Sequence, residues 1–219
     1  GLVPARVIKR ESSTWWNEFW INKGESSGLV LQSPVLTTTL AREGEEPRPA
    51  LIGKVTALSE NTAKVLLLTD ERCKVAAKVD RTLESGLLMG SRAQDGTPTL
   101  MLRYLSKNTE ELLNNPNANV LSSPAGGVVP ANFLLGIVKD FKTLEFYGEA
   151  TVEPAVDFAQ LTDVFVMLPT DEAQVIEAAE AADAESAAIP RAAIPVAEPT
   201  SEPDPSARIE PEPGTLPEQ

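Results

Sequence analysis

The chain contains no histidine, and this restricts the chemistry that its side chains can perform. Histidine is the base of Ser-His-Asp and Cys-His catalysis and the commonest metal ligand. No Ser-x-x-Lys pattern is present, and we expect no Gly-x-Ser-x-Gly nucleophile elbow. The phosphate-binding patterns GxxxxGK(S/T) and GxGxxG are missing as well. We therefore predict that the protein is not an enzyme and has no catalytic residues, no metal-binding residues and no cofactor.

Two carboxylates and one cysteine remain as candidates for chemistry. Asp70 and Glu71 are adjacent and follow the apolar run 63–69. Paired carboxylates form the centre of some hydrolases. The same position also favours a strand-ending turn in which Asp70 accepts hydrogen bonds from backbone amides. Cys73 is the single cysteine, so no intramolecular disulfide can form, and we expect it to pack as a small apolar residue.

All three tryptophans lie close together in the sequence, which is the most unusual local feature of the chain. If residues 16–22 form a strand, Trp16 and Trp20 share one face, and Trp15 and Phe19 share the other. One set then fills the core while the other packs beneath a loop. Alternatively, Trp16 and Trp20 belong to a protein-binding surface, because tryptophan is enriched at interface hot spots.

Short runs with strand character recur along the chain, and turn residues separate them. They are residues 5–10, 16–22, 33–40, 50–58, 63–69, 73–79, 85–89, 99–105, 119–122, 134–141, 148–156 and 163–168. Many short strands without intervening helices predict a sandwich or barrel rather than a parallel sheet. We expect an all-β fold with two small antiparallel β-barrels, similar in shape to the barrel pair of chymotrypsin-like proteases but without catalytic residues.

Three local patterns refine this expectation. Val65–Leu68 is apolar on both strand parities, which predicts a strand buried on both faces. Residues 108–115 (NTEELLNN) favour one short turn of helix. We expect the glycines to mark turns, at Gly24, Gly28, Gly86, Gly90, Gly126 and Gly127.

The composition changes after Leu168. Residues 169–219 contain twelve acidic residues against two arginines, half of the eighteen prolines and no aromatic residue. Such a segment cannot bury enough apolar surface to fold, so we expect a disordered, Ala/Pro/Glu-rich acidic tail. Elsewhere Lys and Arg are scattered singly, which predicts no nucleic-acid groove. No apolar run approaches the roughly 18 residues that span a bilayer.

Several segments have an order and spacing that resemble a known family. They are Ala5-Arg-Val-Ile, Trp15-Trp16, Phe19-Trp-Ile-Asn-Lys-Gly24, Gly28-Leu, Pro34-Val, Leu51-Ile-Gly-Lys-Val55, Val65-Leu-Leu-Leu-Thr-Asp70, Gly127-Val-Val-Pro130, Gly136-Ile-Val138 and Ala150-Thr-Val-Glu-Pro-Ala-Val-Asp-Phe158, leading to Val164-Phe-Val166. Together they resemble the extracytoplasmic β-domain region of the rod shape-determining protein MreC family.

The chain departs from the family pattern in a few places. Asn117-Ala-Asn119 stands where the family usually has Gly-Asp, and Asn132 stands where a glycine is expected. Asparagine adopts left-handed backbone more readily than most residues, so a turn remains compatible with these substitutions. The loop 42–49 and the acidic tail are also peculiar to this chain.

The resemblance implies a scaffold of the bacterial cell-elongation machinery that organises peptidoglycan synthesis and maintains rod shape. Its implied partners are a class B penicillin-binding protein, MreD, the MreB-linked elongation complex and further copies of itself. It also implies a place on the periplasmic or extracytoplasmic face of the cytoplasmic membrane, held there by an N-terminal transmembrane helix that this chain does not include. As partner-binding residues we select aromatic residues that we expect to be exposed: Trp16, Trp20, Phe146 and Tyr147.

The order of the predicted strands also suggests how they divide between the two barrels. We expect residues 5–58 and 118–168 to form a discontinuous first barrel and residues 63–106 to form the second, although a sequential split is also compatible. An adhesin-like surface module is one alternative function. The other is a hydrolase on a double-barrel fold, which would need a centre such as Asp70 and Glu71.

Overall fold

The computed structural model describes residues 1–39, 46–82, 84–93, 95–106, 118–127 and 129–169. The short helix expected at 108–115 and the acidic tail after residue 169 lie outside the described residues. Within the described part the fold is all-β, as predicted, and each of the twelve predicted runs contains or overlaps a strand. The other regular elements in that part are short 3₁₀ turns: η1 (Ser12–Thr14), η2 (Glu25–Ser27), η4 (Pro124–Gly126) and η5 (Phe158–Gln160).

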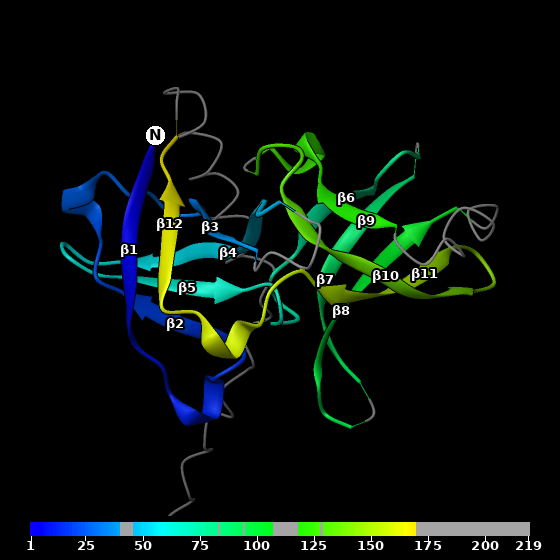
Figure 1. Ribbon diagram of the computed structural model, residues 1–219, viewed down its shortest axis with the longest axis horizontal. Coiled ribbons are helices and arrows are strands. Elements are labelled where there is room, and N and C mark those ends of the chain that lie inside the picture. The colour runs from blue at the N-terminus through cyan, green and yellow to red at the C-terminus, as the bar shows by residue number, and fades with distance from the viewer. Residues whose placement is uncertain (40–45, 83, 94, 107–117, 128, 170–219) are drawn as a thin grey trace, which may run out of the picture. The chain divides into compact units, whose positions relative to one another are not determined.

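The strands form two closed antiparallel rings that share one continuous sheet order (Figure 1). The first ring runs β4 (Pro49–Leu58), β3 (Pro34–Thr38), β12 (Asp163–Met167), β1 (Leu2–Lys9), β2 (Glu18–Ile21) and β5 (Ala63–Leu67), and the β4–β5 pairing closes it. The second ring runs β11 (Gly148–Pro154), β8 (Pro98–Leu105), β7 (Ser85–Arg92), β6 (Val75–Val79), β9 (Asn119–Ser122) and β10 (Leu134–Thr143), and the β10–β11 pairing closes it. A single parallel bridge between Leu134 and Ala50 links the rings.

This pairing differs from the expected division of the chain. β5 pairs with β2 and with β4, so residues 63–67 belong to the first ring and not to the second. β9, β10 and β11 pair with β6 and β8, which places residues 119–154 in the second ring. Of the C-terminal strands, β12 alone returns to the first ring, where it pairs with β1 and β3. The sequence boundaries were wrong because alternation reveals a strand but not its hydrogen-bonding partner.

The apolar residues in and just after β5 are buried, which confirms the prediction of a strand buried on both faces. Val65, Leu66, Leu67 and Leu68 are all buried, and they belong to one apolar cluster that includes residues from both rings. Fully burying one such leucine stabilises the fold by about 1.5–3 kcal/mol. The same cluster contains Cys73, whose thiol is buried.

Two glycines expected at turns lie inside a strand instead. Gly86 and Gly90 are both part of β7. A Cβ atom built at Gly90 would lie 2.3 Å from the carbonyl carbon of Thr69, and one at Gly86 would lie 2.2 Å from the carbonyl oxygen of Arg103. These positions need glycine because another backbone segment approaches closely. Gly28 does occupy a turn, where its φ of 80° is left-handed.

Candidate partner-binding surfaces

The tryptophan residues do not divide between strand faces as expected. β2 begins at Glu18, so Trp15 and Trp16 lie in the turn before it, where strand alternation does not apply. Within β2 the alternation holds: Phe19 is buried, and Trp20 lies on the opposite side, with the Lys64 ammonium 5.3 Å from its ring. Trp16 and Trp20 therefore do not share a face.

Arg10 attaches the turn that holds Trp15 to the C-terminal part of the first barrel. Its guanidinium lies 5.1 Å from the ring centres of Trp15 and Phe19. Nη1 also donates a hydrogen bond of 2.8 Å to the carbonyl of Phe158, and Nη2 donates one of 3.3 Å to the carbonyl of Leu161. Burial lowers the pKa of Arg10, although the charge of nearby Asp157 acts in the opposite direction.

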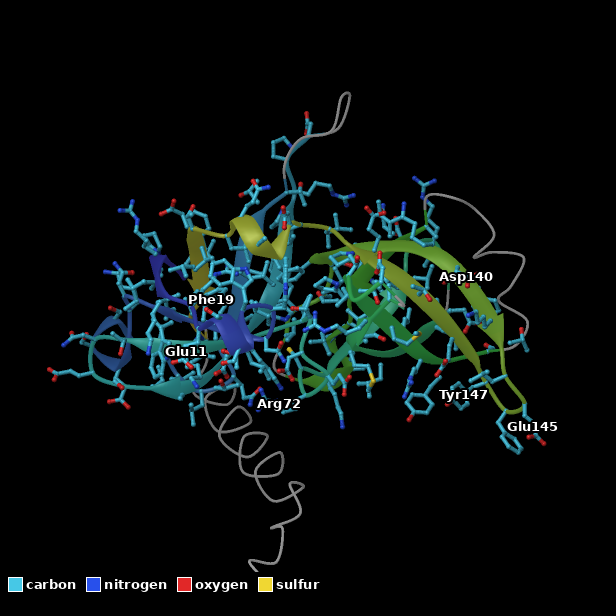
Figure 2. The ribbon with its side chains drawn as sticks, turned by 90° about the horizontal axis from the view of Figure 1, so that it is seen from below. Glu11, Phe19, Arg72, Asp140, Glu145 and Tyr147 are labelled. Atoms are coloured by element: carbon cyan, nitrogen blue, oxygen red, sulfur yellow. The ribbon has the colours of Figure 1, made fainter. Side chains whose placement is uncertain are left out.

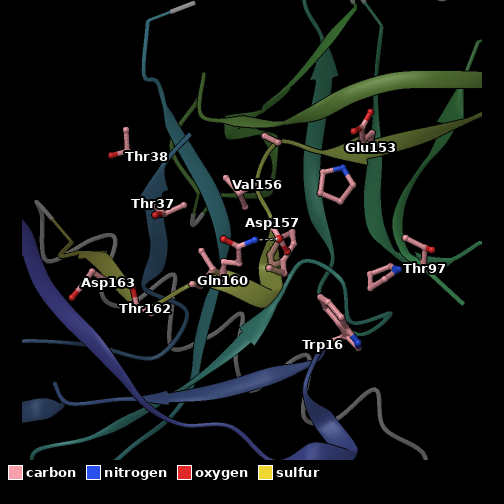
Figure 3. A pocket seen from close by; sticks show the side chains of 15 residues that line it. Trp16, Thr37, Thr38, Thr97, Glu153, Val156, Asp157, Gln160, Thr162 and Asp163 are labelled. Carbon is pink, nitrogen blue, oxygen red and sulfur yellow. Dashed lines mark hydrogen bonds between the residues drawn. The ribbon is translucent and has the colours of Figure 1, made fainter. Parts of the chain in front are cut away.

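Trp16 lines a cavity of about 680 Å³ (Figure 3). It lies on one side of this cavity, while Thr37 and Thr38 lie on the other and Asp157 and Gln160 lie in the centre of the view. The Asp157 carboxylate accepts hydrogen bonds from the backbone amide of Ala159 at 2.9 Å and from Nε2 of Gln160 at 2.8 Å. Asp157 thus caps η5 and fixes one wall of the cavity.

The second exposed aromatic surface is at the end of the β10–β11 hairpin. Phe146 has 82% of its surface exposed, the highest value among the large apolar residues that the structure describes, and Leu144 is also exposed. The ring of the neighbouring Tyr147 lies 5.0 Å from that of Tyr104, a residue of β8. We call these four residues the hairpin patch; Figure 2 shows Tyr147 and Glu145 at the hairpin end.

Two of the four residues in the hairpin patch are among the partner-binding residues selected from the sequence. Phe146 and Tyr147 were selected as aromatic residues expected to be exposed, and the structure places them side by side in the β10–β11 turn, where Leu144 N donates to the Tyr147 carbonyl. Tyr104 was missed because it lies within an expected strand. Its positive φ of 68°, a conformation uncommon outside glycine, is a tertiary feature that no local pattern indicated.

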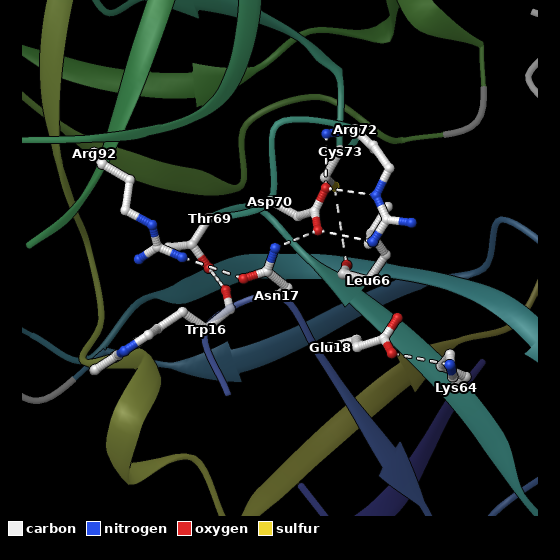
Figure 4. A network of polar contacts seen from close by, with 10 residues as sticks. All are labelled: Trp16, Asn17, Glu18, Lys64, Leu66, Thr69, Asp70, Arg72, Cys73 and Arg92. Carbon is white, nitrogen blue, oxygen red and sulfur yellow. Dashed lines mark hydrogen bonds and ion pairs between the residues drawn. The ribbon is translucent and has the colours of Figure 1, made fainter. Parts of the chain in front are cut away.

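The Asp70 carboxylate is a structural group that holds a turn (Figure 4). Oδ1 accepts hydrogen bonds from the backbone amide and Nε of Arg72, at 2.8 and 2.9 Å. Oδ2 accepts from Nη2 of Arg72 at 2.9 Å and from Nδ2 of Asn17 at 2.7 Å. Burial raises the pKa of Asp70, but these hydrogen bonds outweigh it and hold the pKa below its ordinary value.

This geometry disfavours the hydrolase alternative. Asp70 is 2% exposed and both of its oxygens are occupied, while the adjacent Glu71 is exposed. A pair of catalytic carboxylates must instead face one substrate bond from a shared cleft. The arrangement matches the alternative in which Asp70 ends a strand by binding a backbone amide.

The same network joins the two barrels. Asn17 precedes β2 of the first ring, and its side-chain oxygen accepts a hydrogen bond of 3.2 Å from Nη2 of Arg92, at the end of β7 in the second ring. Gly90 N, also in β7, donates to the carbonyl of Asp70 at 3.3 Å. Asn17 therefore contacts both the Asp70 turn and the second barrel.

Contrary to the sequence expectation, the chain does contain one Gly-x-Ser-x-Gly pattern. Residues 24–28 read Gly-Glu-Ser-Ser-Gly and match the letters of a nucleophile elbow. In the structure they form η2 and its caps, and the Ser26 hydroxyl donates to the side-chain oxygen of Asn61 at 3.0 Å. A nucleophile elbow instead places its serine on a sharp strand-to-helix turn next to a base.

Within the described ranges, no group of three or more Cys, Asp or Glu side chains is arranged to hold a metal ion. None of the helical segments in that part is long and apolar enough to cross a bilayer.

By its fold the chain is a double β-barrel protein, with an exposed phenylalanine on a hairpin and a half-buried tryptophan beside a cavity. The chain belongs to the MreC family, because the family model for the rod shape-determining protein MreC, barrel core, matches residues 7–168. This match confirms the resemblance inferred from the sequence.

Individual relatives agree with this assignment. The cell shape-determining protein MreC of Caulobacter vibrioides is 28% identical over 172 residues, which is 74% of this chain and 45% of that protein. The protein of the same name from Listeria monocytogenes is 28% identical over 175 residues, or 78% of this chain and 55% of that protein. The chain thus spans about half the length of these relatives.

Solved structures of the family share the fold. MreC from Listeria monocytogenes superposes with a TM-score of 0.65 and 26% identity, over 78% of this chain and 77% of that one. MreC in a complex with a Penicillin-Binding Protein (PBP2) from Helicobacter pylori superposes with a TM-score of 0.54 and 14% identity, over 76% of this chain and 97% of that one.

Proposed function

We propose that this chain is the barrel core of a non-catalytic scaffold that organises peptidoglycan synthesis during cell elongation and so maintains rod shape. The observation that carries the proposal is the match of the MreC barrel-core model to residues 7–168. A scaffold acts through binding energy: it stabilises one conformation of a partner enzyme by binding that conformation more tightly than the others.

The partner that we propose is a class B penicillin-binding protein. Support comes from the solved complex in which a Helicobacter pylori relative of the same fold binds a penicillin-binding protein. The family also leads us to propose MreD, the MreB-linked elongation complex and further copies of the chain as partners. In this proposal the barrels work on the extracytoplasmic side of the cytoplasmic membrane, attached through an N-terminal anchor.

We assign the penicillin-binding protein to the hairpin patch. Phe146 and Tyr147 were among the four residues selected from the sequence. Phe146, Tyr104 and Leu144 are exposed and Tyr147 is half-buried, and together they form an apolar surface on one hairpin and the strand beside it. Aromatic residues at the centre of an interface carry most of its binding energy. Trp20 is a weaker candidate because it lies against Lys64, and Trp16 because it packs partly against the core.

A titration against the soluble domain of an elongation-specific class B penicillin-binding protein tests this proposal. The wild-type chain is expected to bind saturably by interferometry, and a Phe146→Ser, Tyr147→Ser double variant is expected to bind at least roughly tenfold more weakly. The matched control is Leu2→Ser, which removes another exposed apolar side chain, on β1 of the first barrel.

Each outcome of this titration has a clear meaning. Loss of binding in the double variant alone, with its melting curve unchanged, supports the hairpin patch. Equal weakening by Leu2→Ser contradicts the hairpin patch as the binding site but remains consistent with a penicillin-binding protein as the partner. Absence of binding to an active penicillin-binding protein contradicts the proposed partner itself.

A further inference from the structure

The cavity beside Trp16 combines flat apolar surfaces with uncharged polar groups. Pro98 and Pro154 line it together with the indole of Trp16, and Thr37 and Thr38 supply hydroxyl groups. Its volume of about 680 Å³ lies within the range of about 300–1,000 Å³ that is usual for small-ligand sites. Apolar walls that carry a few polar groups are typical of such sites.

Several polar side chains of the cavity have no partner among the described residues. No hydrogen bond found in that part of the chain uses Nε1 of Trp16 or the hydroxyls of Thr37 and Thr38. Nε1 is also not one of the buried atoms there that lack a partner, so it reaches solvent. Gln160 donates from Nε2 to Asp157 (Figure 3), which leaves its Oε1 as an acceptor. The cavity therefore offers a ligand both donors and acceptors.

The carboxylates that line the cavity each have a cation beside them. The three pairs are Glu153 with Lys139 at 2.5 Å, Asp163 with Arg6 at 3.3 Å, and Asp157 with Arg10 by electrostatic attraction. None of the described lining residues is Lys or Arg. Because the acidic groups are compensated and no basic group lines the walls, the cavity favours a neutral ligand over a charged one.

A strand of a partner protein fits this cavity poorly, because β3 lies between β4 and β12. β3 pairs with β12 at Val35 and Leu36, and the same register places Thr38 opposite Asp163. On the β4 side, Thr38 lies in register with Pro49. An added peptide strand needs a row of unpaired backbone groups at an edge. The groups that the cavity offers are instead side-chain hydroxyls, an amide oxygen and an indole N–H.

These groups match the chemistry of a sugar ring. The face of a pyranose carries C–H groups, which pack on flat apolar surfaces such as an indole or a proline ring. Its edge carries hydroxyls, which donate and accept hydrogen bonds and can pair with threonine hydroxyls, an amide oxygen and an indole N–H. A neutral oligosaccharide therefore satisfies both kinds of surface in the cavity.

We propose that the cavity binds a short stretch of neutral oligosaccharide. One sugar ring packs against Trp16, and its hydroxyls bond to the indole Nε1, to Thr38 and to Gln160. The assignment of this sugar to a glycan strand of peptidoglycan rests on the proposed function, which places the barrels beside that polymer. The cavity is separate from the hairpin patch, so the protein can hold a partner enzyme at one site and a glycan at the other.

Oligosaccharides of defined composition test the proposal on the full chain. The first probe is tetra-N-acetylchitotetraose, titrated into isotope-labelled protein. The indole N–H of Trp16, the backbone amide of Thr38 and the side-chain amide of Gln160 are followed by NMR. Saturable shifts at all three positions are expected below about 10 mM sugar.

Two further sugars separate the source of the ligand from the effect of charge. Maltotetraose is neutral but consists of glucose without acetamido groups. Weaker binding of maltotetraose supports a cell-wall glycan as the ligand, whereas equal binding supports a general sugar site and contradicts that source. Deacetylated chitotetraose carries an ammonium group on each ring. It is expected to bind no more tightly than the acetylated form, because the carboxylates already have cations beside them.

Matched variants locate the site. Trp16→Phe keeps an aromatic face but removes the N–H, and Thr38→Val removes one hydroxyl. Each is expected to weaken tetrasaccharide binding roughly three- to tenfold, the effect of one lost hydrogen bond. The controls are Trp20→Phe in β2 and Thr143→Val at the exposed end of β10, which lie outside the cavity and are expected to leave binding unchanged. All four variants retain Gln160 as the reporter.

Three results would overturn the proposal. They are the absence of saturable shifts at Trp16 and Gln160 at about 10 mM tetrasaccharide, tighter binding of the deacetylated sugar, and equal effects of the cavity variants and their controls. None of these results bears on the titration against the penicillin-binding protein, which uses another surface and another probe. Failure of the sugar site is therefore distinguishable from failure of the proposed function.

Discussion

At the scale of single residues, Asp70 shows how one carboxylate organises a junction. Its neighbours in sequence indicated a turn that binds a backbone amide, and Arg72 N supplies that bond. The structure adds the Asn17 side chain, which also accepts a hydrogen bond from Arg92 of the second barrel. Since both oxygens are bonded to donors, the ionised form is the one that stabilises the fold.

Replacement of Asp70 by Asn is expected to destabilise the protein by about 1.5–3 kcal/mol at neutral pH, because it removes charge-assisted hydrogen bonds in a buried site. The pKa of Asp70 is lowered in the folded state. Its contribution is therefore complete above the unfolded value of about 3.9 and is lost as pH falls through the folded value.

Urea unfolding of both proteins across a pH series checks this expectation. The difference in unfolding free energy should be constant near neutrality and should shrink below about pH 4. Glu71→Gln, at the exposed neighbour, serves as the control and should have little effect. A difference that stays constant down to the lowest pH would contradict the role given to the ionised carboxylate.

At the scale of elements, β7 depends on a glycine where the two barrels meet. Gly90 lies in the middle of β7, and its amide bonds to the Asp70 carbonyl. The position has no room for a side chain, because the Thr69 backbone would contact any Cβ atom. The glycine thus permits β7 to lie close to the connection between β5 and β6.

A Gly90→Ala variant is expected to lower the melting temperature by several degrees. An added methyl group forces backbone apart, which costs about 1–3 kcal/mol or more, and each kcal/mol shifts the melting temperature of a protein this size by about 2–4 °C. The control is Gly126→Ala, where the added Cβ would meet the Cβ of Ala76 at 3.4 Å, an ordinary contact.

Differential scanning calorimetry on both glycine variants measures this difference. If Gly90→Ala and Gly126→Ala melt at the same temperature, the close approach of β7 to Thr69 does not limit the packing.

At the scale of the whole molecule, the first barrel includes a pair of strands from the two ends of the folded region. β1 and β12 pair over Leu2–Arg6 and Asp163–Met167, so the first barrel needs both ends of the region 2–167. A truncation inside β12 would open that ring. The segment after residue 168 contributes no aromatic residue and little apolar surface by composition.

Deletion of residues 169–219 is therefore expected to leave the melting temperature nearly unchanged, because a segment of this composition cannot stabilise a core. Calorimetry on the shortened and complete chains makes the comparison. A drop of many degrees would contradict the expectation and would show that this segment contributes to the stability of the barrels.

The candidate sites were less predictable than the fold. Phe146 and Tyr147 were selected because we expected them to be exposed; Phe146 is exposed and Tyr147 is half-buried, on a hairpin whose turn the sequence placed between two strands. Trp16 and Trp20 were grouped by an alternation that begins only at Glu18.

The sequence by itself determined the all-β class and the approximate positions of the twelve strands. These properties follow from local alternation, turn residues and composition, which act over a few neighbouring residues. Only the tertiary structure decided which strands close each ring, why Gly90 is required, and which aromatic side chains stay exposed. Those outcomes depend on hydrogen bonding and burial between segments far apart in the chain, where many pairings satisfy the same alternation.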